Sequence, residues 1–269
     1  MQTQIDLSRV IKAKAPARKR TVTLRTIVPT LALRKDLAVI YLRVVKAWRN
    51  HIAETILPMY GATLERVVKD DVTSTLAHAL SRAEEDAYRV VAEQKANAQA
   101  WTVRVEKWHL GQWVSALKSG AGVSIAGVLL NEDAADQISF ALERNASLIT
   151  NLSADMQKRV EQTIWQGVAN QVPRRELAKQ LQESLDIGRS RALTIARDQT
   201  NKLSGELDRL RQEQAGITSY EWVDSGKVHY RPEHRSRRGK IYRWDKPPAD
   251  GHPRTQPNCG CSAKAVLEI

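Results

Sequence analysis

Apolar residues recur every three or four positions along most of the chain, which is the spacing of amphipathic helices. Pro58 and Gly61 are expected to end the first helix, and Gly188 to separate the last two, because neither residue type favours a helix interior. The predicted helices cover residues 31–57, 64–91, 133–145, 154–170, 173–187 and 190–215. Three tryptophans at similar spacing could form a binding surface, although packing in the core or between helices explains them better: Trp101, Trp108 and Trp113.

The composition changes after Gly216, which is a favourable helix stop. Two segments rich in aromatic and β-branched residues, 219–223 and 240–244, predict short strands, and proline and glycine then become frequent. Residues 217–269 therefore predict a small module, and so few residues cannot form a large core alone. Such a module must dock on the rest of the chain or be held together by a cross-link such as a bound metal. The whole pattern predicts a mainly α fold, in which an elongated helical body carries a small α+β, loop-rich C-terminal module.

Several classes of protein are disfavoured by what the sequence lacks. No run of about 18 apolar residues occurs, so no membrane-spanning helix is expected. The basic N-terminal residues are not followed by an apolar segment, so no secretory signal is expected. The glycine-containing segment 120–130 matches neither the GxxxxGK[ST] nor the GxGxxG pattern, which argues against a nucleotide site there.

Positive charge is concentrated at the two ends of the chain. The net charge of +12 divides into +8 over residues 1–35, −1 over residues 36–221 and +5 over residues 222–269. The first stretch contains a proline-interrupted basic run that predicts an extended arm, either a solvated tail or a contact for polyphosphate. The candidate contacts to double-stranded DNA, which would be independent of its sequence, are Lys12, Lys14, Arg18, Lys19, Arg20, Arg235, Arg237, Arg238 and Lys240.

The C-terminal module holds both cysteines of the chain and three of its six histidines. A disulfide between Cys259 and Cys261 would close a very small, strained ring, so a reducing compartment is expected. Two thiolates and two imidazoles complete a tetrahedral Zn²⁺ site, and His234 and His252 are the natural partners of the cysteines. The alternative is that the cysteines are packed in the core and that the histidines form hydrogen bonds with loops.

Enzymatic functions remain as alternatives to a structural one. The histidines His229, His234 and His252 could serve a metal-dependent nuclease or another DNA-acting enzyme, and a Cys–His nucleophile pair is conceivable. Neither arrangement has an assigned acid partner or a recognisable nuclease pattern. A freestanding DNA-binding regulator is a third possibility, but no helix-turn-helix or zinc-finger pattern supports it.

Short motifs in a fixed order carry a resemblance to a known family over residues 150–269. A helix containing Arg191–Gln199 (RALTIARDQ) is followed by Gly216-Ile217 and the strand Tyr220-Glu221-Trp222. The remaining motifs are Arg231-Pro232-Glu233-His234, Gly239-Lys240-Ile241-Tyr242, Trp244-Asp245, Pro247-Pro248, Gly251-His252-Pro253 and Asn258-Cys259-Gly260-Cys261-Ser262-Ala263. This set resembles the Mu F-like minor head protein family, the head-morphogenesis proteins of tailed bacteriophages.

The chain departs from the family pattern at two positions. Lys227 stands where family members usually have an acid, and Gly260 stands between the two cysteines where they have an arginine. The joint loss of both residues is consistent with an Asp–Arg pair in the family.

The resemblance implies a structural virion protein rather than an enzyme. It implies association with the portal protein, the major capsid protein or both, and a part in head morphogenesis, DNA packaging or ejection. The expected location is the virion head near the portal, with assembly in the host cytoplasm and no membrane partner. The expected regions are a basic arm at 1–30, a helical region at 31–150, the helical part of the Mu F-like domain at 151–216, and the Cys/His-containing module at 217–269.

Overall fold

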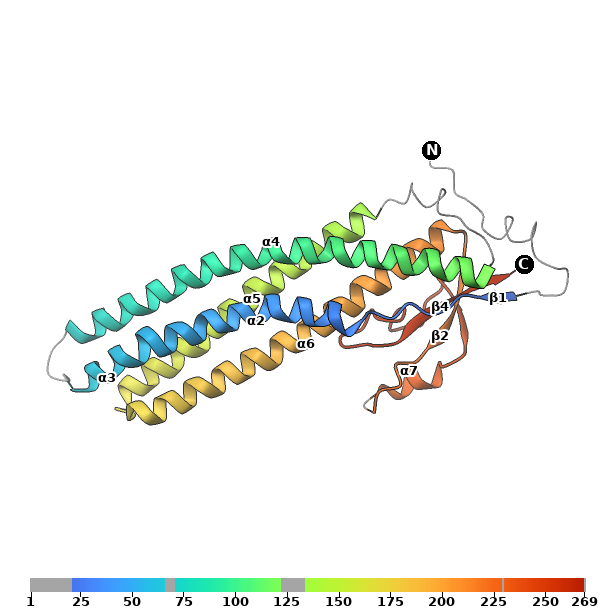
Figure 1. Cartoon of the computed structure of the whole chain (residues 1–269). Coiled ribbons are helices and arrows are strands. Elements are labelled where there is room, and N and C mark those ends of the chain that lie inside the picture. The colour runs from blue at the N-terminus through green and yellow to red at the C-terminus, as the bar shows by residue number, and fades with distance from the viewer. Residues whose placement is uncertain (1–20, 66–70, 122–133, 229, 269) are drawn as a thin grey trace. The chain divides into compact units, whose positions relative to one another are not determined.

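Long helices make up most of the computed structural model, which describes residues 21–65, 71–121, 134–228 and 230–268. Figure 1 shows these elements in chain order. The mainly α class predicted from the apolar spacing is confirmed. The helices are α2 (Leu31–His51), the π-helical turn η1 (Ile52–Ile56), α3 (Leu57–Glu65), α4 (Asp71–Ala121), α5 (Ala135–Ala169), α6 (Arg174–Gln214) and the short α7 (Pro232–Ser236).

The helix breaks predicted at Pro58, Gly61 and Gly188 are wrong. α3 continues directly from the π-helical turn η1, so Pro58 and Gly61 both lie inside one continuous helical segment. The π-helical turn interrupts the regular i→i−4 hydrogen bonding just before Pro58, since the backbone N–H of Leu57 bonds to the carbonyl of Ile52. Gly188 lies within α6, where a Cβ atom would come within 2.9 Å of the Met156 sulfur on α5. That glycine therefore permits close helix packing instead of ending a helix, and α5 likewise runs unbroken where two helices were predicted.

The chain forms two compact units, each assembled from separated segments. The sheet unit contains the described residues of 1–34, 102–141 and 197–269, and the helical unit contains those of 35–101 and 142–196. Because α4 and α6 both continue from one unit into the other, the units do not follow simple sequence ranges. No described helix combines the length and the apolar character that a membrane span requires.

The core of the helical unit joins α2 to α5 through buried aromatic side chains with polar ends. The Tyr41 hydroxyl donates a hydrogen bond to Asn145 Oδ1 at 2.8 Å, and the Trp48 indole N–H donates one to Ser153 Oγ at 3.2 Å. Both aromatic side chains are almost fully buried. These bonds satisfy groups that would otherwise be costly to remove from water, and so they specify the register of the two helices.

A four-stranded antiparallel sheet characterises the sheet unit. Its strands are β1 (Thr21–Thr23), β2 (Ser219–Val223), β3 (Ile241–Arg243) and β4 (Ser262–Glu268), in the order β1-β4-β2-β3. The strands predicted around residues 219–223 and 240–244 are confirmed, whereas β1 and β4 were not predicted. β4 was missed because its described side chains are nearly all buried and show no polar–apolar alternation.

Two clusters of apolar side chains include residues of this sheet. One joins Leu24, Ile217 and Leu267 to Trp113 and Leu117 of α4. The sheet therefore docks on helices within its own unit, as its small size requires. The second cluster contains Tyr220, Trp222, Trp244, Cys259, Cys261 and Ala263, so both cysteines lie in a core.

Candidate functional site

The Asn-Cys-Gly-Cys segment is held against α6 by polar residues of the Arg191–Gln199 motif and of the next turn of the same helix. The Asp198 carboxylate accepts a hydrogen bond from the backbone N–H of Asn258 at 2.5 Å, and Arg197 donates to Asn258 Oδ1 at 3.1 Å. Asn201 donates to the carbonyl of Cys259 at 3.1 Å. Asn258 has a φ of 58°, a left-handed conformation that asparagine tolerates well. Two motifs about sixty residues apart in sequence are thus parts of one local structure.

Three potential metal ligands converge where this segment meets α7. The Nδ1 atom of His234 lies 3.5 Å from the Cys259 sulfur and 3.6 Å from the Cys261 sulfur. All three donor atoms lie within 4.8 Å of one another, and all three residues are buried. Among the described residues, these are the histidine, cysteine and acidic side chains that meet closely enough to share one ion.

The orientation of His234 is set by an acid on its far side. Its Nε2–H donates to Asp250 Oδ2 at 2.9 Å, and Arg237 donates to the other carboxylate oxygen at 2.6 Å. Burial by itself would raise the pKa of Asp250, but the hydrogen bonds from Arg237 and His234 lower it below its usual value. Asp250 is therefore an ionised acceptor for Nε2–H, and in this ring orientation Nδ1 of His234 is directed at the sulfurs.

The two thiols affect each other's ionisation. A hydrogen bond with Cys261 lowers the pKa of Cys259, and the same bond raises the pKa of Cys261. The physical cause is that one thiolate is stabilised by the neighbouring S–H, while a second negative charge beside it is disfavoured. A cation placed between the two sulfurs would remove this repulsion.

The two family departures lie next to each other in space. A Cβ atom at Gly260 would lie 2.9 Å from the Lys227 ammonium nitrogen, which donates to the Asn258 carbonyl at 3.1 Å. Lys227 therefore fills the space that a side chain at position 260 would need. Burial is the main factor that lowers the pKa of Lys227, and attraction to Cys259 and Cys261 opposes this effect.

His252, the second imidazole expected in the zinc site, lies elsewhere in the sheet unit. Its Nδ1 shares a hydrogen bond with the Tyr220 hydroxyl at 3.0 Å, and its ring packs on Trp244 with centroids 4.8 Å apart. Burial lowers the pKa of His252. The structure thus brings together three of the four residues expected in the site, and His252 instead supports the aromatic core.

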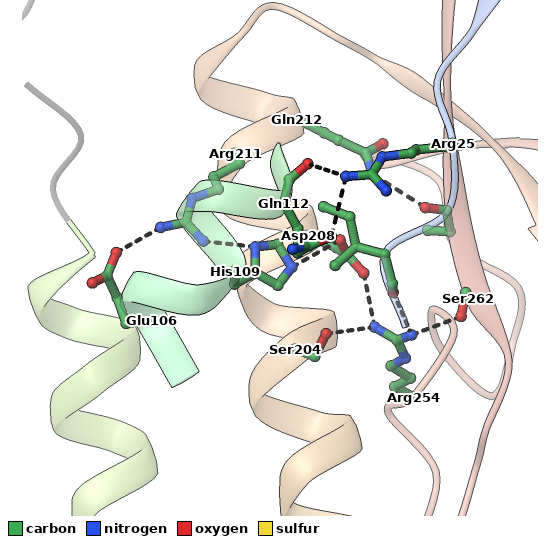
Figure 2. Close-up of polar contacts among 12 residues, drawn as sticks. Arg25, Glu106, His109, Gln112, Ser204, Asp208, Arg211, Gln212, Arg254 and Ser262 are labelled. Carbon is green, nitrogen blue, oxygen red and sulfur yellow. Dashed lines mark hydrogen bonds and ion pairs between the residues drawn. The ribbon is translucent and has the colours of Figure 1, made fainter. Parts of the chain in front are cut away.

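A buried charge network, which the sequence did not predict, lies in the same unit (Figure 2). Arg254 is 2% exposed, and its guanidinium donates to Asp208 at 2.8 Å and to Ser204 at 2.9 Å. The same group donates to Ser262 at 2.7 Å and to the carbonyl of Ile27 at 2.9 Å. Arg254 therefore links α6, β4 and the segment after β1, and its backbone N–H also donates to the Cys259 sulfur at 3.4 Å.

The network continues through a buried histidine to α4. Arg211 donates to His109 Nδ1 at 2.6 Å and to Glu106 at 2.6 Å, while His109 Nε2 lies 3.0 Å from Asp208 (Figure 2). Because a guanidinium can only donate, His109 Nδ1 must be an acceptor, so His109 is neutral and its Nε2–H donates to Asp208. Burial lowers the pKa of His109 despite the nearby carboxylate, which agrees with this assignment.

This network is suited to structure rather than to catalysis. Its charges are compensated in pairs and lie away from solvent, where the loss of a single partner is strongly destabilising. One sequence signal could have identified it, since Ser204, Asp208 and Arg211 repeat at helical spacing beside the buried leucines of α6.

The predicted DNA contacts of the C-terminal module differ in their exposure to solvent and in whether a carboxylate neutralises their charge. Arg237 is directed at Asp250 and lies within 5.0 Å of the Trp222 ring, so most of its side chain is covered. Arg235 is exposed and stacks over Tyr230, Arg238 is exposed with Asp224 at 3.6 Å, and Lys240 is exposed. The predicted arm contacts Lys12, Lys14, Arg18, Lys19 and Arg20, together with His229, lie outside the described residues.

Comparisons with known proteins agree with the motif resemblance. Residues 155–264 match the family model of phage Mu protein F like proteins. Over 154 residues the chain is 29% identical to an uncharacterized protein of Haemophilus influenzae, which corresponds to 56% of this chain and 34% of that protein. The chain therefore spans about a third of the length of this curated relative. No solved structure matches the chain. The family match includes the α6 motif, both predicted strands and the two cysteines, so residues 155–264 are similar to phage Mu protein F like proteins.

Proposed function

We propose that this chain is a structural head-morphogenesis protein of a tailed bacteriophage. The observation that carries the proposal is the family match over residues 155–264. The residues that make this match specific are also those that interlock in the structure, since Asp198 of α6 holds the backbone of Asn258. The proposed role is that of a minor capsid protein in the virion head near the portal, assembled in the host cytoplasm.

The proposed partners are the portal protein, the major capsid protein or both, with a part in DNA packaging or ejection. We expect no enzymatic activity. The buried network around Asp208 and His109 supports this expectation, because its charged groups are paired with one another and removed from solvent. Such an arrangement stabilises a fold and does not present a reactive group to a substrate.

Contact with double-stranded DNA is proposed to be electrostatic and independent of base sequence. The proposed arm contacts are Lys12, Lys14, Arg18, Lys19 and Arg20. In the C-terminal module, Arg235, Arg238 and Lys240 are exposed and are the stronger candidates. Arg237 is the weaker candidate, because Asp250 already neutralises its charge.

Analysis of purified virions tests the proposed function. Mass spectrometry of gradient-purified particles should detect the chain at a constant ratio to the portal protein. Removal of its gene should lower the yield of DNA-filled heads, and expression of the chain in trans should restore it. Absence from particles together with normal head assembly in the deletion strain would overturn the proposal.

A nuclease assay separates this proposal from the enzymatic alternative. The purified chain is incubated with linear DNA in Zn²⁺, Mg²⁺ or Mn²⁺, beside a His234→Ala variant. We expect no cleavage by either protein. Cleavage by the unmodified chain that disappears in the variant would favour a metal-dependent nuclease.

A further inference from the structure

We propose that His234, Cys259 and Cys261 bind one Zn²⁺ ion in the sheet unit, and that this ion ties α7 to the start of β4. The site is independent of the proposed role in head morphogenesis, since a virion protein or an enzyme could equally contain it. These residues supply three of the four ligands of a tetrahedral ion.

The separations of the three donors agree with a tetrahedral zinc ion. Zn–S bonds of about 2.3 Å and Zn–N bonds of about 2.0 Å at tetrahedral angles place sulfur and nitrogen about 3.5 Å apart. The observed distances from His234 Nδ1 to the two sulfurs are 3.5 Å and 3.6 Å. An ion can therefore enter without moving the histidine away from either cysteine.

The histidine is already held in the form that binds metal. Asp250 accepts from Nε2–H, so the lone pair of His234 Nδ1 is directed toward the sulfurs. A carboxylate behind a ligating histidine is a frequent arrangement at zinc sites, because it fixes both the ring orientation and the tautomer. Arg237 in turn holds Asp250 in place at 2.6 Å, and the side chain of Arg237 is itself largely covered.

Neighbouring N–H groups are positioned to support thiolate ligands. The backbone N–H of Arg254 donates to the Cys259 sulfur at 3.4 Å. The indole N–H of Trp222 is buried and lacks a hydrogen-bond partner among the described residues, and Trp222 belongs to the same core cluster as Cys261. Ionisation of Cys261 on metal binding would give this N–H an acceptor.

Charge balance favours a doubly charged ion in this position. Two thiolates and one neutral imidazole reduce the net charge of a bound Zn²⁺ to zero, so the nearby ammonium of Lys227 meets no uncompensated positive charge. Without metal, the Lys227 ammonium beside Gly260 can compensate one thiolate. The rival state is therefore a metal-free thiolate paired with Lys227.

Cobalt substitution of the reduced, full-length chain tests the site directly. Co²⁺ added to the metal-free protein should produce thiolate-to-cobalt charge-transfer absorption that saturates at one equivalent, and Zn²⁺ should abolish that absorption. Metal analysis of protein purified without chelator should find close to one zinc per chain. Less than about a tenth of an equivalent, with no cobalt absorption, would overturn the proposal and favour the metal-free pair, because structural zinc sites bind very tightly.

Substitutions identify the ligands. Cys259→Ser and Cys261→Ser should each reduce the charge-transfer intensity by about half or abolish it, and His234→Ala should weaken Co²⁺ binding. His252→Asn is the matched control, because it lies in the same unit, keeps an acceptor for Tyr220 and should leave the absorption unchanged. Loss of the absorption in His252→Asn, with native circular dichroism, would overturn the three-residue ligand set.

Asp250 is a positioning residue whose effect can be measured separately. Asp250→Asn should weaken Co²⁺ affinity by about 10- to 100-fold while the charge-transfer bands keep their positions. Unchanged affinity would contradict the proposed role of this carboxylate. The affinity is compared for metal-free proteins that both show native circular dichroism, so that a loss of folded protein does not account for the difference.

Discussion

At the scale of single residues, the buried polar side chains are defined by the groups that face them. His109 is confined between Asp208 on its Nε2 side and Arg211 on its Nδ1 side, with Glu106 and Arg254 one bond further along the network. A proton on Nδ1 would place an N–H against a guanidinium. The folded protein therefore requires a neutral imidazole at this position.

This requirement predicts that stability falls in mild acid. Burial keeps the pKa of His109 below its ordinary value in the folded state, so the unfolded chain binds the proton more readily. The stabilising contribution is complete above the unfolded pKa of about 6.5 and decreases as the pH falls below it, by about 1 kcal/mol between pH values of about 7.5 and 5.5. Urea unfolding at these two pH values measures the change.

Two histidine variants test whether His109 causes this pH dependence of stability. His109→Gln should remove this part of the pH dependence, because glutamine does not titrate. His78→Gln, at an exposed position on α4, should retain it. An identical pH dependence in His109→Gln and the unmodified chain would show that His109 does not contribute.

At the scale of helices and strands, glycine has different roles that sequence position alone does not reveal. In α6, a Cβ atom at Gly205 would lie 2.9 Å from the Arg254 Cβ and 3.4 Å from the Pro253 carbonyl. In α4, a Cβ atom at Gly111 would meet nothing within 4 Å. The first glycine lets the loop that carries Arg254 approach the helix, and the second only weakens a helix.

Alanine substitutions at these two positions should therefore have opposite effects. Gly205→Ala should lower the free energy of unfolding by about 1–2 kcal/mol, because backbone and Cβ atoms of the loop must move. Gly111→Ala should raise it by about 0.5–1 kcal/mol, since alanine favours the helix. Urea denaturation of the full-length variants measures both changes, and a stabilising Gly205→Ala would contradict the close packing of this loop.

At the scale of the whole molecule, the excess positive charge and the long helices lie in different parts of the sequence. The near-neutral residues 36–221 contain most of the long helices, whereas the excess positive charge lies at the two ends of the sequence. A protein surface that binds the phosphates of DNA requires local positive charge and little else. The exposed contacts Arg235, Arg238 and Lys240 can therefore be replaced without altering the described cores.

Replacement of the arm residues Lys12, Lys14, Arg18, Lys19 and Arg20 by glutamine should weaken DNA binding and reduce its salt dependence. The slope of log affinity against log salt should become shallower by about 0.9 for every phosphate that the arm no longer neutralises, because fewer counterions are then released. Fluorescence anisotropy with two unrelated duplexes at several salt concentrations measures the slope, which should not depend on the duplex.

A control with the same change in net charge isolates the effect of position. Glutamine replaces five exposed bases of the neutral region: Lys46, Arg49, Arg82, Lys95 and Lys158. This variant should keep a larger slope than the arm variant. Equal slopes in the two variants would show that overall charge, and not the arm, determines DNA binding.

The sequence by itself determined the helical class, the two strands near residues 220 and 242, and the similarity of residues 155–264 to phage Mu protein F like proteins, because apolar periodicity and short ordered motifs are local properties. It also indicated the three residues of the candidate metal site, since Cys259 and Cys261 are close neighbours in sequence and His234 lies in a recognisable motif.

Only the tertiary structure decided which groups meet across the chain. It separated His252 from the cysteines, placed Asp250 behind His234, and brought Lys227 to the space beside Gly260. It also revealed that Gly188 permits helix packing rather than a break. The physical reason is that hydrogen bonding, burial and close approach depend on the distances between residues far apart in sequence, which local periodicity does not encode.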